Sequence, residues 1–141
     1  MTGRRRSGFT LLELTVVLVV IGVLAALVVP RVLGRTTQAR RTRAAADLGI
    51  LAQALEGYRL DAGVYPTTAQ GLEALVRMPT LPPLPSRWRP DGYLPALPRD
   101  PWGREYRYAC ADGRHLTVRS LGGDGEPGGD GEAADVESDA P

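Results

Sequence analysis

The feature that most constrains this chain is an uncharged, strongly apolar segment of 17 residues, residues 14–30 (LTVVLVVIGVLAALVVP). A helix that crosses a bilayer needs about 20 mostly apolar residues, so this segment is at the short end of the range. Extending it back to Phe9 gives a comfortable length but places Glu13 inside the apolar run. Because an ionised carboxylate in lipid is costly unless a positive charge pairs with it, Glu13 is a candidate functional residue.

The arginines around this segment bear on two points, namely whether it is a cleaved signal peptide and in which direction it crosses the membrane. Residues 4–6 (RRR) precede it, as in a secretory signal peptide. The run is nevertheless longer than the usual apolar region of about 7 to 15 residues, and no A-x-A cleavage site opens onto a mature chain. We therefore favour a membrane anchor. A count of basic residues alone would place its C-terminal side in the cytoplasm, because five arginines follow it closely: Arg31, Arg35, Arg40, Arg41 and Arg43.

Charge is segregated along the chain. Residues 1–43 contain a single acidic residue, Glu13, whereas residues 120–141 contain acidic residues and no basic one. All 17 basic residues are arginine, and those near the start flank the apolar segment. Since they do not interleave with aromatic residues over a folded face, we expect membrane headgroups and not nucleic acid as their partner.

The helix is expected to continue past Pro30, which would kink it. Apolar residues then recur at spacings of three and four, which predicts one stripe on an amphipathic helix. The stripe consists of Ala44, Leu48, Leu51, Ala52, Leu55 and Tyr58. We therefore predict one long helix from Phe9 to about Tyr58, whose second half packs against the rest of the chain.

A short second helix is predicted after residue 61, where glycine, proline and aromatic residues become frequent. Thr67 and Gln70 have the spacing of a capping box, and apolar residues follow at Leu72, Leu75 and Val76. Residues 79–98 are a proline-rich loop whose expected anchors are Trp88, Tyr93 and Leu97.

A β-hairpin is predicted further on. The DPWG sequence at residues 100–103 has turn chemistry. The alternating segments 105–108 and 115–119 then flank a turn at residues 112–113, which is typical of an antiparallel hairpin. The side chains expected to face the helix stripe are Tyr106, Tyr108, Leu116 and Val118.

Nothing in the sequence indicates an enzyme. The single histidine, His115, is expected to have no paired carboxylate or nucleophile nearby in the sequence, and no nucleophile elbow, phosphate loop or HExxH motif is present. The single cysteine, Cys110, excludes an intrachain disulfide and is expected to be a buried thiol.

The acidic, glycine-rich segment 122–132 (GGDGEPGGDGE) allows two interpretations. Few apolar residues are available to order it, so it fits a disordered acidic tail. Oxygen ligands alternating with glycine also suit Ca²⁺, which takes six to eight oxygens from carboxylates and carbonyls. The spacing is neither an EF-hand nor an RTX repeat. Candidate ligands are the side chains of Asp124 and Asp135, the carbonyls of Leu121 and Glu126, and further help from Asp130 or Glu132.

Two sequence motifs resemble a known family. Residues 8–13 (GFTLLE) resemble the prepilin signal of type IV pilins and pseudopilins. Residues 58–76 (YRLDAGVYPTTAQGLEALV), with the DPWG motif, resemble the major pseudopilin of type II secretion, the general secretion pathway protein G family. The likeness extends from Gly8 to about Asp135.

The resemblance implies an α+β fold of the type IV pilin kind, in which a long N-terminal helix packs on a small antiparallel sheet with a C-terminal calcium loop. Its parts would be a leader at residues 1–8, a transmembrane assembly segment at 9–30, an amphipathic helical half at 31–60 and a periplasmic part at 61–141. The calcium loop would be residues 120–136, within that last part.

The resemblance also implies processing and partners. A prepilin peptidase would cleave between Gly8 and Phe9 and methylate Phe9. The subunit would be single-pass in the bacterial inner membrane, with a cytoplasmic N-terminus, against the arginine count. It would polymerise helically with itself, and meet minor pseudopilins, the inner-membrane assembly platform and secreted proteins, to drive export of folded proteins across the outer membrane.

This sequence matches the calcium loop of the family only in part. Ser120 to Gly125 match the family's loop entry, and Asp135 matches its acidic exit, but Ala134 stands where some relatives have a second acid. Asp130 or Glu132 is the candidate replacement.

The sequence also allows two other functions. One is a type IV pilin or minor pseudopilin, and the other is a membrane-anchored calcium-binding or substrate-recognition module that does not polymerise. In the leading interpretation, cleavage creates an α-ammonium on Phe9, with a pKa of about 8, that can pair with Glu13 within or between subunits.

Overall fold

The structure, a computed structural model, describes residues 10–138, apart from the side chains of residues 27–35. Gly8, Phe9 and the predicted leader lie outside the described residues. The chain divides into two compact units, Met1–Thr36 and Thr37–Pro141, and each is described by itself.

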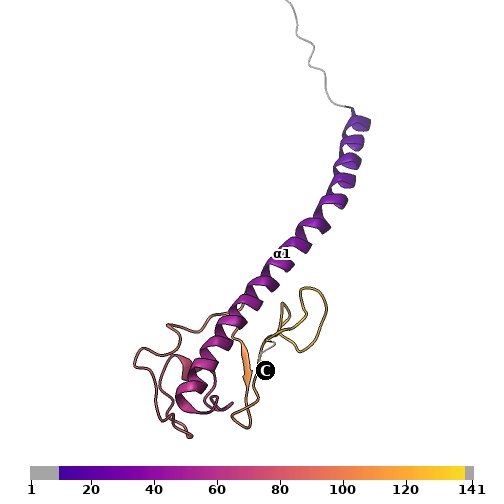
Figure 1. The fold of residues 1–141 in the computed structure, drawn as a ribbon. Coiled ribbons are helices and arrows are strands. Elements are labelled where there is room, and N and C mark those ends of the chain that lie inside the picture. The colour runs from indigo at the N-terminus through magenta and orange to yellow at the C-terminus, as the bar shows by residue number, and fades with distance from the viewer. Residues whose placement is uncertain (1–9, 139–141) are drawn as a thin grey trace, which may run out of the picture. The chain divides into compact units, whose positions relative to one another are not determined.

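Helix α1 covers Leu11–Ala62, which confirms the predicted long helix and extends its end by one turn (Figure 1). The next residue, Gly63, has a φ of +86° and donates its backbone N–H to the Arg59 carbonyl at 2.7 Å. A glycine in this left-handed conformation is the usual C-terminal stop of a helix.

No helix in the described part of the chain is both long enough and apolar enough to cross a membrane. The predicted membrane segment 9–30 also includes Phe9 and the side chains of residues 27–30, which are not described, so it stays a prediction.

The predicted stripe on α1 forms one wall of the core of the second unit. Its members Ala44, Leu48, Leu51, Leu55 and Tyr58 are at most 2% exposed. Ala52 was expected in this wall but is only half-buried, and Ala54 is buried in its place. The buried face is therefore set by which residues the loops and sheet cover, which spacing alone does not specify.

The predicted second helix is shorter than expected. The capping box forms, because Thr67 N–H donates to Gln70 Oε1 at 2.8 Å and Gln70 N–H donates to Thr67 Oγ1 at 3.2 Å. Only a 3-10 helix, η1 at Leu72–Leu75, follows it. Leu72, Ala74 and Leu75 of η1 are buried in the core.

The proline-rich loop is anchored by aromatic residues as predicted. Trp88 Nε1 donates to the Ala74 carbonyl at 3.1 Å. The ring of Tyr93 packs on Tyr58 of α1 with a centroid distance of 5.4 Å, and Leu97 packs against the same core.

A three-stranded antiparallel sheet completes the fold, with the order β1-β2-β3. Strand β1 is Arg107–Ala109, β2 is Thr117–Ser120 and β3 is Val136–Glu137. The first two are the predicted hairpin, with Tyr108 opposite Val118. The third strand was not predicted, since two residues are too few to show alternation.

The predicted inner face of the hairpin packs on the helix. Tyr106 and Val118 are buried, and Tyr108 and Leu116 are half-buried against the same cluster. Tyr106 also donates its hydroxyl to Asp47 of α1 at 3.1 Å.

Candidate functional site

The start of α1 has a side-chain cap that the sequence analysis missed. Glu13 N–H donates to Thr10 Oγ1 at 3.2 Å, and Leu14 N–H donates to the Thr10 carbonyl at 3.2 Å. Thr10 and Glu13 have the spacing of a capping box, which was the available signal. Glu13 lies in the first turn of α1, where the positive end of the helix dipole favours a carboxylate.

The first unit presents an apolar surface around the helix. Its large apolar side chains from residue 11 to residue 24 are 49% to 81% exposed. The one hydroxyl among them, Thr15 Oγ1, donates back to the Leu12 carbonyl at 2.8 Å, so its polar group is satisfied on its own helix. A contiguous apolar surface of this kind is typical of a segment that meets lipid or other apolar helices.

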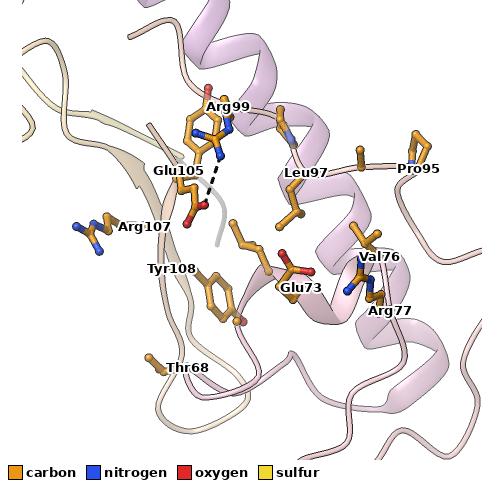
Figure 2. A pocket seen from close by; sticks show the side chains of 15 residues that line it. Thr68, Glu73, Val76, Arg77, Pro95, Leu97, Arg99, Glu105, Arg107 and Tyr108 are labelled. Carbon is orange, nitrogen blue, oxygen red and sulfur yellow. Dashed lines mark ion pairs between the residues drawn. The ribbon is translucent and has the colours of Figure 1, made fainter. Parts of the chain in front are cut away.

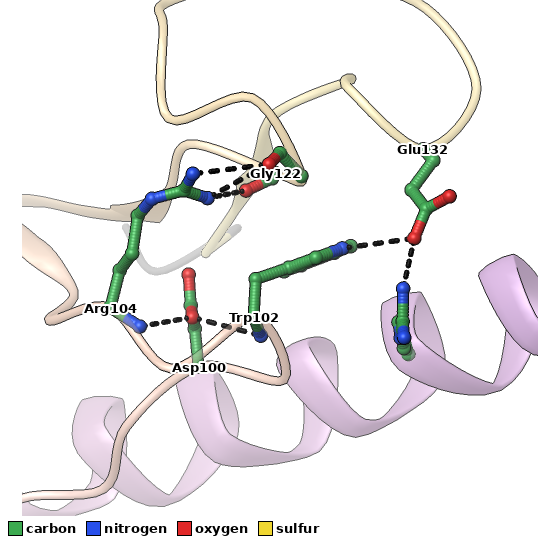
Figure 3. A network of polar contacts seen from close by, with 7 residues as sticks. Asp100, Trp102, Arg104, Gly122 and Glu132 are labelled. Carbon is green, nitrogen blue, oxygen red and sulfur yellow. Dashed lines mark hydrogen bonds and ion pairs between the residues drawn. The ribbon is translucent and has the colours of Figure 1, made fainter.

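In the second unit, the DPWG turn is organised by the buried carboxylate of Asp100, which is 3% exposed. Asp100 Oδ1 accepts the backbone N–H of Trp102 at 3.1 Å and that of Arg104 at 2.7 Å (Figure 3). Its Oδ2 accepts the hydroxyl of Ser120, at the end of β2, at 2.7 Å. The turn therefore holds Trp102 and Arg104 beside the start of the acidic loop.

The acidic loop is folded back on itself, unlike the disordered tail that its composition allowed. Gly123 N–H donates to the Glu132 carbonyl at 2.8 Å, and Asp135 N–H donates to the Gly128 carbonyl at 3.2 Å. These bonds join the first limb of the loop, residues 121–128, to its second limb, residues 130–135, which leads into β3.

Gly122 shows how closely the two limbs approach. Its φ is +60°, and a Cβ atom there would lie 2.5 Å from the Ala133 carbonyl oxygen. Both the backbone conformation and the contact require glycine.

The six predicted calcium ligands are all in this loop, but they have different surroundings. Asp124 Oδ1 accepts Glu126 N–H at 3.1 Å, and the Leu121 carbonyl accepts Gly125 N–H at 3.1 Å. The side chains of Glu126 and Asp130 are exposed. No group of three or more His, Cys, Asp or Glu side chains positioned to hold a metal ion occurs within the described residues.

Among the predicted calcium ligands, Asp135 has surroundings that fit a cation. Its Oδ2 is 3.8 Å from Arg119 Nη1, whereas its Oδ1 is buried and has no hydrogen-bond partner in the described structure. An unsatisfied carboxylate oxygen is costly to bury, and Ca²⁺ coordination would satisfy it. Asp135 Oδ1 therefore fits one ligand position of a hard cation.

Glu132, another of the predicted calcium ligands, contacts an arginine and a tryptophan. Its Oε1 forms an ion pair with Arg40 Nη1 of α1 and accepts Trp102 Nε1–H at 3.3 Å (Figure 3). Sequence reasoning could not have found this contact, since Arg40 and Glu132 are 92 residues apart.

Asp112 and His115 form a polar pair at the hairpin turn. Asp112, three residues before His115, is a partner carboxylate that the sequence analysis overlooked, and its Oδ2 is 2.6 Å from His115 Nδ1. Hydrogen bonds from the backbone N–H and then the side chain of His115 hold the pKa of Asp112 well below its ordinary value. Both side chains are exposed at the hairpin turn, and their bonds order that turn.

A cleft of about 680 Å³ lies between η1 and β1 (Figure 2). Its charges are mixed, with Glu73, Arg77 and an Arg99–Glu105 ion pair of 3.9 Å. Its lining residues, all in the described chain, include no Ser, Cys, His or Asp side chain.

A helix with an exposed apolar first part, whose second part packs on a small antiparallel sheet, defines the pilin-like class. Comparison with known proteins identifies the family within this class. A family model described as "Type II secretion system (T2SS), protein G" matches residues 31–139, and one described as "Prokaryotic N-terminal methylation motif" matches residues 3–29. The chain belongs to the type II secretion system protein G family.

Individual relatives agree with this assignment. The chain is 50% identical to type II secretion system core protein G of Pseudomonas aeruginosa over 96% of each chain. It is 48% identical to that of Vibrio cholerae over 94% of this chain and 91% of the relative.

A solved structure is also similar, the crystal structure of the major pseudopilin from the type 2 secretion system of enterohaemorrhagic Escherichia coli. The TM-score is 0.67 and the identity 40%, over 78% of this chain and 95% of that one. The comparisons confirm the fold and support a major pseudopilin over the type IV pilin or minor pseudopilin. The family is one of secretion-system pseudopilins, in agreement with the predicted structural subunit.

Proposed function

We propose that this chain is the major subunit of a type II secretion pseudopilus, and that its polymerisation drives export of folded proteins across the outer membrane. The observation that carries the proposal is the presence, in one chain, of an N-terminal methylation motif at residues 3–29 and a protein G region at residues 31–139. A prepilin peptidase would cleave between Gly8 and Phe9 and methylate Phe9.

The exposed apolar part of α1 supports a membrane location before assembly. Burying such side chains in lipid or against neighbouring apolar helices removes them from water, which stabilises by about 25 cal/mol per Å² of apolar surface. We place the N-terminus in the cytoplasm and the sheet-bearing unit in the periplasm of a bacterium, with the subunit in the inner membrane.

Glu13 would direct assembly. Cleavage leaves an α-ammonium on Phe9, four residues before Glu13 in the sequence, and an α-amino group with the ordinary pKa of about 8 is a cation at neutral pH. Thr10 Oγ1 accepts the Glu13 N–H, which orders the first turn of α1 that carries the Glu13 carboxylate. We infer that the α-ammonium of an incoming subunit pairs with Glu13 of its neighbour, which sets the axial position of the new helix. The assembly platform and minor pseudopilins would meet the same growing end.

We further propose that the loop of residues 120–136 binds Ca²⁺. The orphaned Asp135 Oδ1 supports this proposal. Asp124 and Asp135 would supply the carboxylates, and the Leu121 and Glu126 carbonyls are candidates for neutral ligands. A bound Ca²⁺ would link the two limbs of the loop electrostatically.

Two measurements test the assembly proposal. Mass spectrometry of the processed protein should give a chain that begins at methylated Phe9, and any other cleavage site would contradict the proposal. Glu13→Gln should then abolish filament formation and secretion in cells while processing continues. Normal assembly and secretion by this variant would favour a membrane-anchored module that does not polymerise.

A further inference from the structure

We propose that the acidic loop is fastened by its own arginines, and that Glu132 serves this fastening and not calcium. The fastening, here called the arginine clasp, consists of Arg40, Arg41 and Arg104 together with their acceptors in the loop. The role of Glu132 affects which residues can bind calcium in the proposed function. The clasp itself rests only on the observed contacts of Arg40, Arg41 and Arg104 and does not depend on calcium binding.

The second limb of the loop is held from two directions. From α1, Arg40 forms the ion pair with Glu132, and Arg41 Nη1 donates to the Gly131 carbonyl at 3.0 Å. From the DPWG turn, Trp102 Nε1 donates to the same Glu132 oxygen at 3.3 Å. The limb is therefore tied to both the helix and the turn.

The first limb is held by Arg104. Its Nη1 donates to the Gly122 carbonyl at 2.8 Å, and both of its Nη atoms lie 3.1 Å from the Gly123 carbonyl (Figure 3). A guanidinium that binds two backbone carbonyls places a fixed positive charge where a glycine-rich turn presents its oxygens. Arg104 thus acts on the first limb as Arg40 and Arg41 act on the second.

The two acids at the end of the loop are consequently assigned to different cations. Glu132 uses Oε1 for both Arg40 and Trp102, whereas Asp135 Oδ1 has no partner among the described residues. Glu132 already pairs with Arg40 through Oε1, and a Ca²⁺ on the same carboxylate would bring two cations close together. Because calcium affinity depends on the number of charged ligands, a site without Glu132 would be weak, and the clasp would keep the loop folded without calcium.

The arginine clasp is expected to contribute only modestly to the stability of the fold. The side chains of Arg40 and Glu132 are each 47% exposed, and an exposed ion pair contributes little by itself. The added Trp102 and Arg41 bonds raise the contribution, so we expect loss of Glu132 to lower the melting temperature by roughly 3 °C.

The experiment compares melting temperatures of the full-length chain in detergent, with excess Ca²⁺ and with chelator. Glu132→Gln and Arg40→Gln should each lower the melting temperature by the same amount in both conditions. The double variant should lose no more than the larger single loss, because the two residues share one interaction. Glu126→Gln, an exposed acid of the same loop, is the matched control and should melt like the wild type.

Calcium is tested by a separate variant. Asp135→Asn should lower the melting temperature in Ca²⁺ and have a smaller effect in chelator. If Asp135→Asn and the wild type respond equally to Ca²⁺, the calcium proposal fails while the clasp stands. If instead the Glu132→Gln loss disappears in chelator, Glu132 is a calcium ligand and the clasp assignment is overturned. Additive losses for Arg40→Gln and Glu132→Gln would overturn it as well.

Discussion

The Ser120 hydroxyl donates a hydrogen bond of 2.7 Å to Asp100 Oδ2, and both side chains are buried. This bond joins the end of β2 to the DPWG turn, and through Trp102 and Arg104 it links the core to the acidic loop. The motif by which the sequence resembles its family is thus a structural junction.

Replacing Asp100 by alanine should destabilise this junction. The change leaves the buried Ser120 hydroxyl and two partly buried backbone N–H groups without their acceptor, and an unsatisfied buried group costs about 1 to 3 kcal/mol. Chemical denaturation should show a lower free energy of unfolding for Asp100→Ala. Asp91→Ala, at an exposed aspartate, is the control. Equal unfolding of all three proteins would remove Asp100 from this role.

Gly122→Ala should also destabilise the chain, by about 1 to 3 kcal/mol, since it combines a positive φ with a close contact to the Ala133 carbonyl. Gly131 has nearly the same φ, +61°, but nothing lies within 4 Å of a Cβ atom there. Gly131→Ala therefore measures the backbone strain alone. In thermal melts Gly122→Ala should lose clearly more than Gly131→Ala, and similar losses would show that the limbs can separate without cost.

Thr10→Ala should weaken the first turn of α1, because N-cap loss costs about 1 kcal/mol. We expect Thr10→Ser to keep normal filament assembly in cells and Thr10→Ala to reduce it. Thr15→Ala is a suitable control, since Thr15 Oγ1 donates to the Leu11 and Leu12 carbonyls of its own helix and caps no N–H group there. Equal assembly of Thr10→Ala and wild type would mean that the cap is dispensable.

Glu56 should contribute stability that depends on pH. A hydrogen bond from Arg59 and a further one from Tyr65 lower the pKa of Glu56 from its ordinary value of 4.5 to about 2. Because the folded-state pKa is depressed, the contribution is complete above pH 4.5 and is lost as the pH falls through about 2.

Denaturation between these pH values should therefore show a smaller decline for Glu56→Gln than for the wild type. Glu73→Gln, at an exposed glutamate, should follow the wild-type curve. A Glu56→Gln curve parallel to that of the wild type would contradict the prediction.

Removal of calcium should reproduce the effect of removing a proposed ligand. Asp124→Ala is expected to lower the melting temperature in Ca²⁺, and chelator should cause a similar loss in the wild type, because both leave the loop limbs without their shared cation. Calorimetric titration of the full-length chain with Ca²⁺ gives an independent measurement. Equal melting of the wild type with and without chelator would exclude a stabilising calcium site.

Much of the fold was predictable because local patterns determine it. Leu48, Leu51 and Leu55 recur at helical spacing, and the Thr67–Gln70 capping box formed as expected. Strand β3 was missed because Val136–Glu137 is too short to show a pattern and forms only where β2 is available to pair with it.

The candidate sites, like the fold, could be predicted from the sequence only in part. The sequence by itself determined the long helix, the position of Glu13 in its first turn and the set of acids in the loop, because these depend on neighbours along the chain. Only the tertiary structure decided that Glu132 binds Arg40 while Asp135 Oδ1 receives no hydrogen bond from the described residues. Which carboxylate meets which cation depends on how distant segments close on one another, and residue spacing does not contain that information.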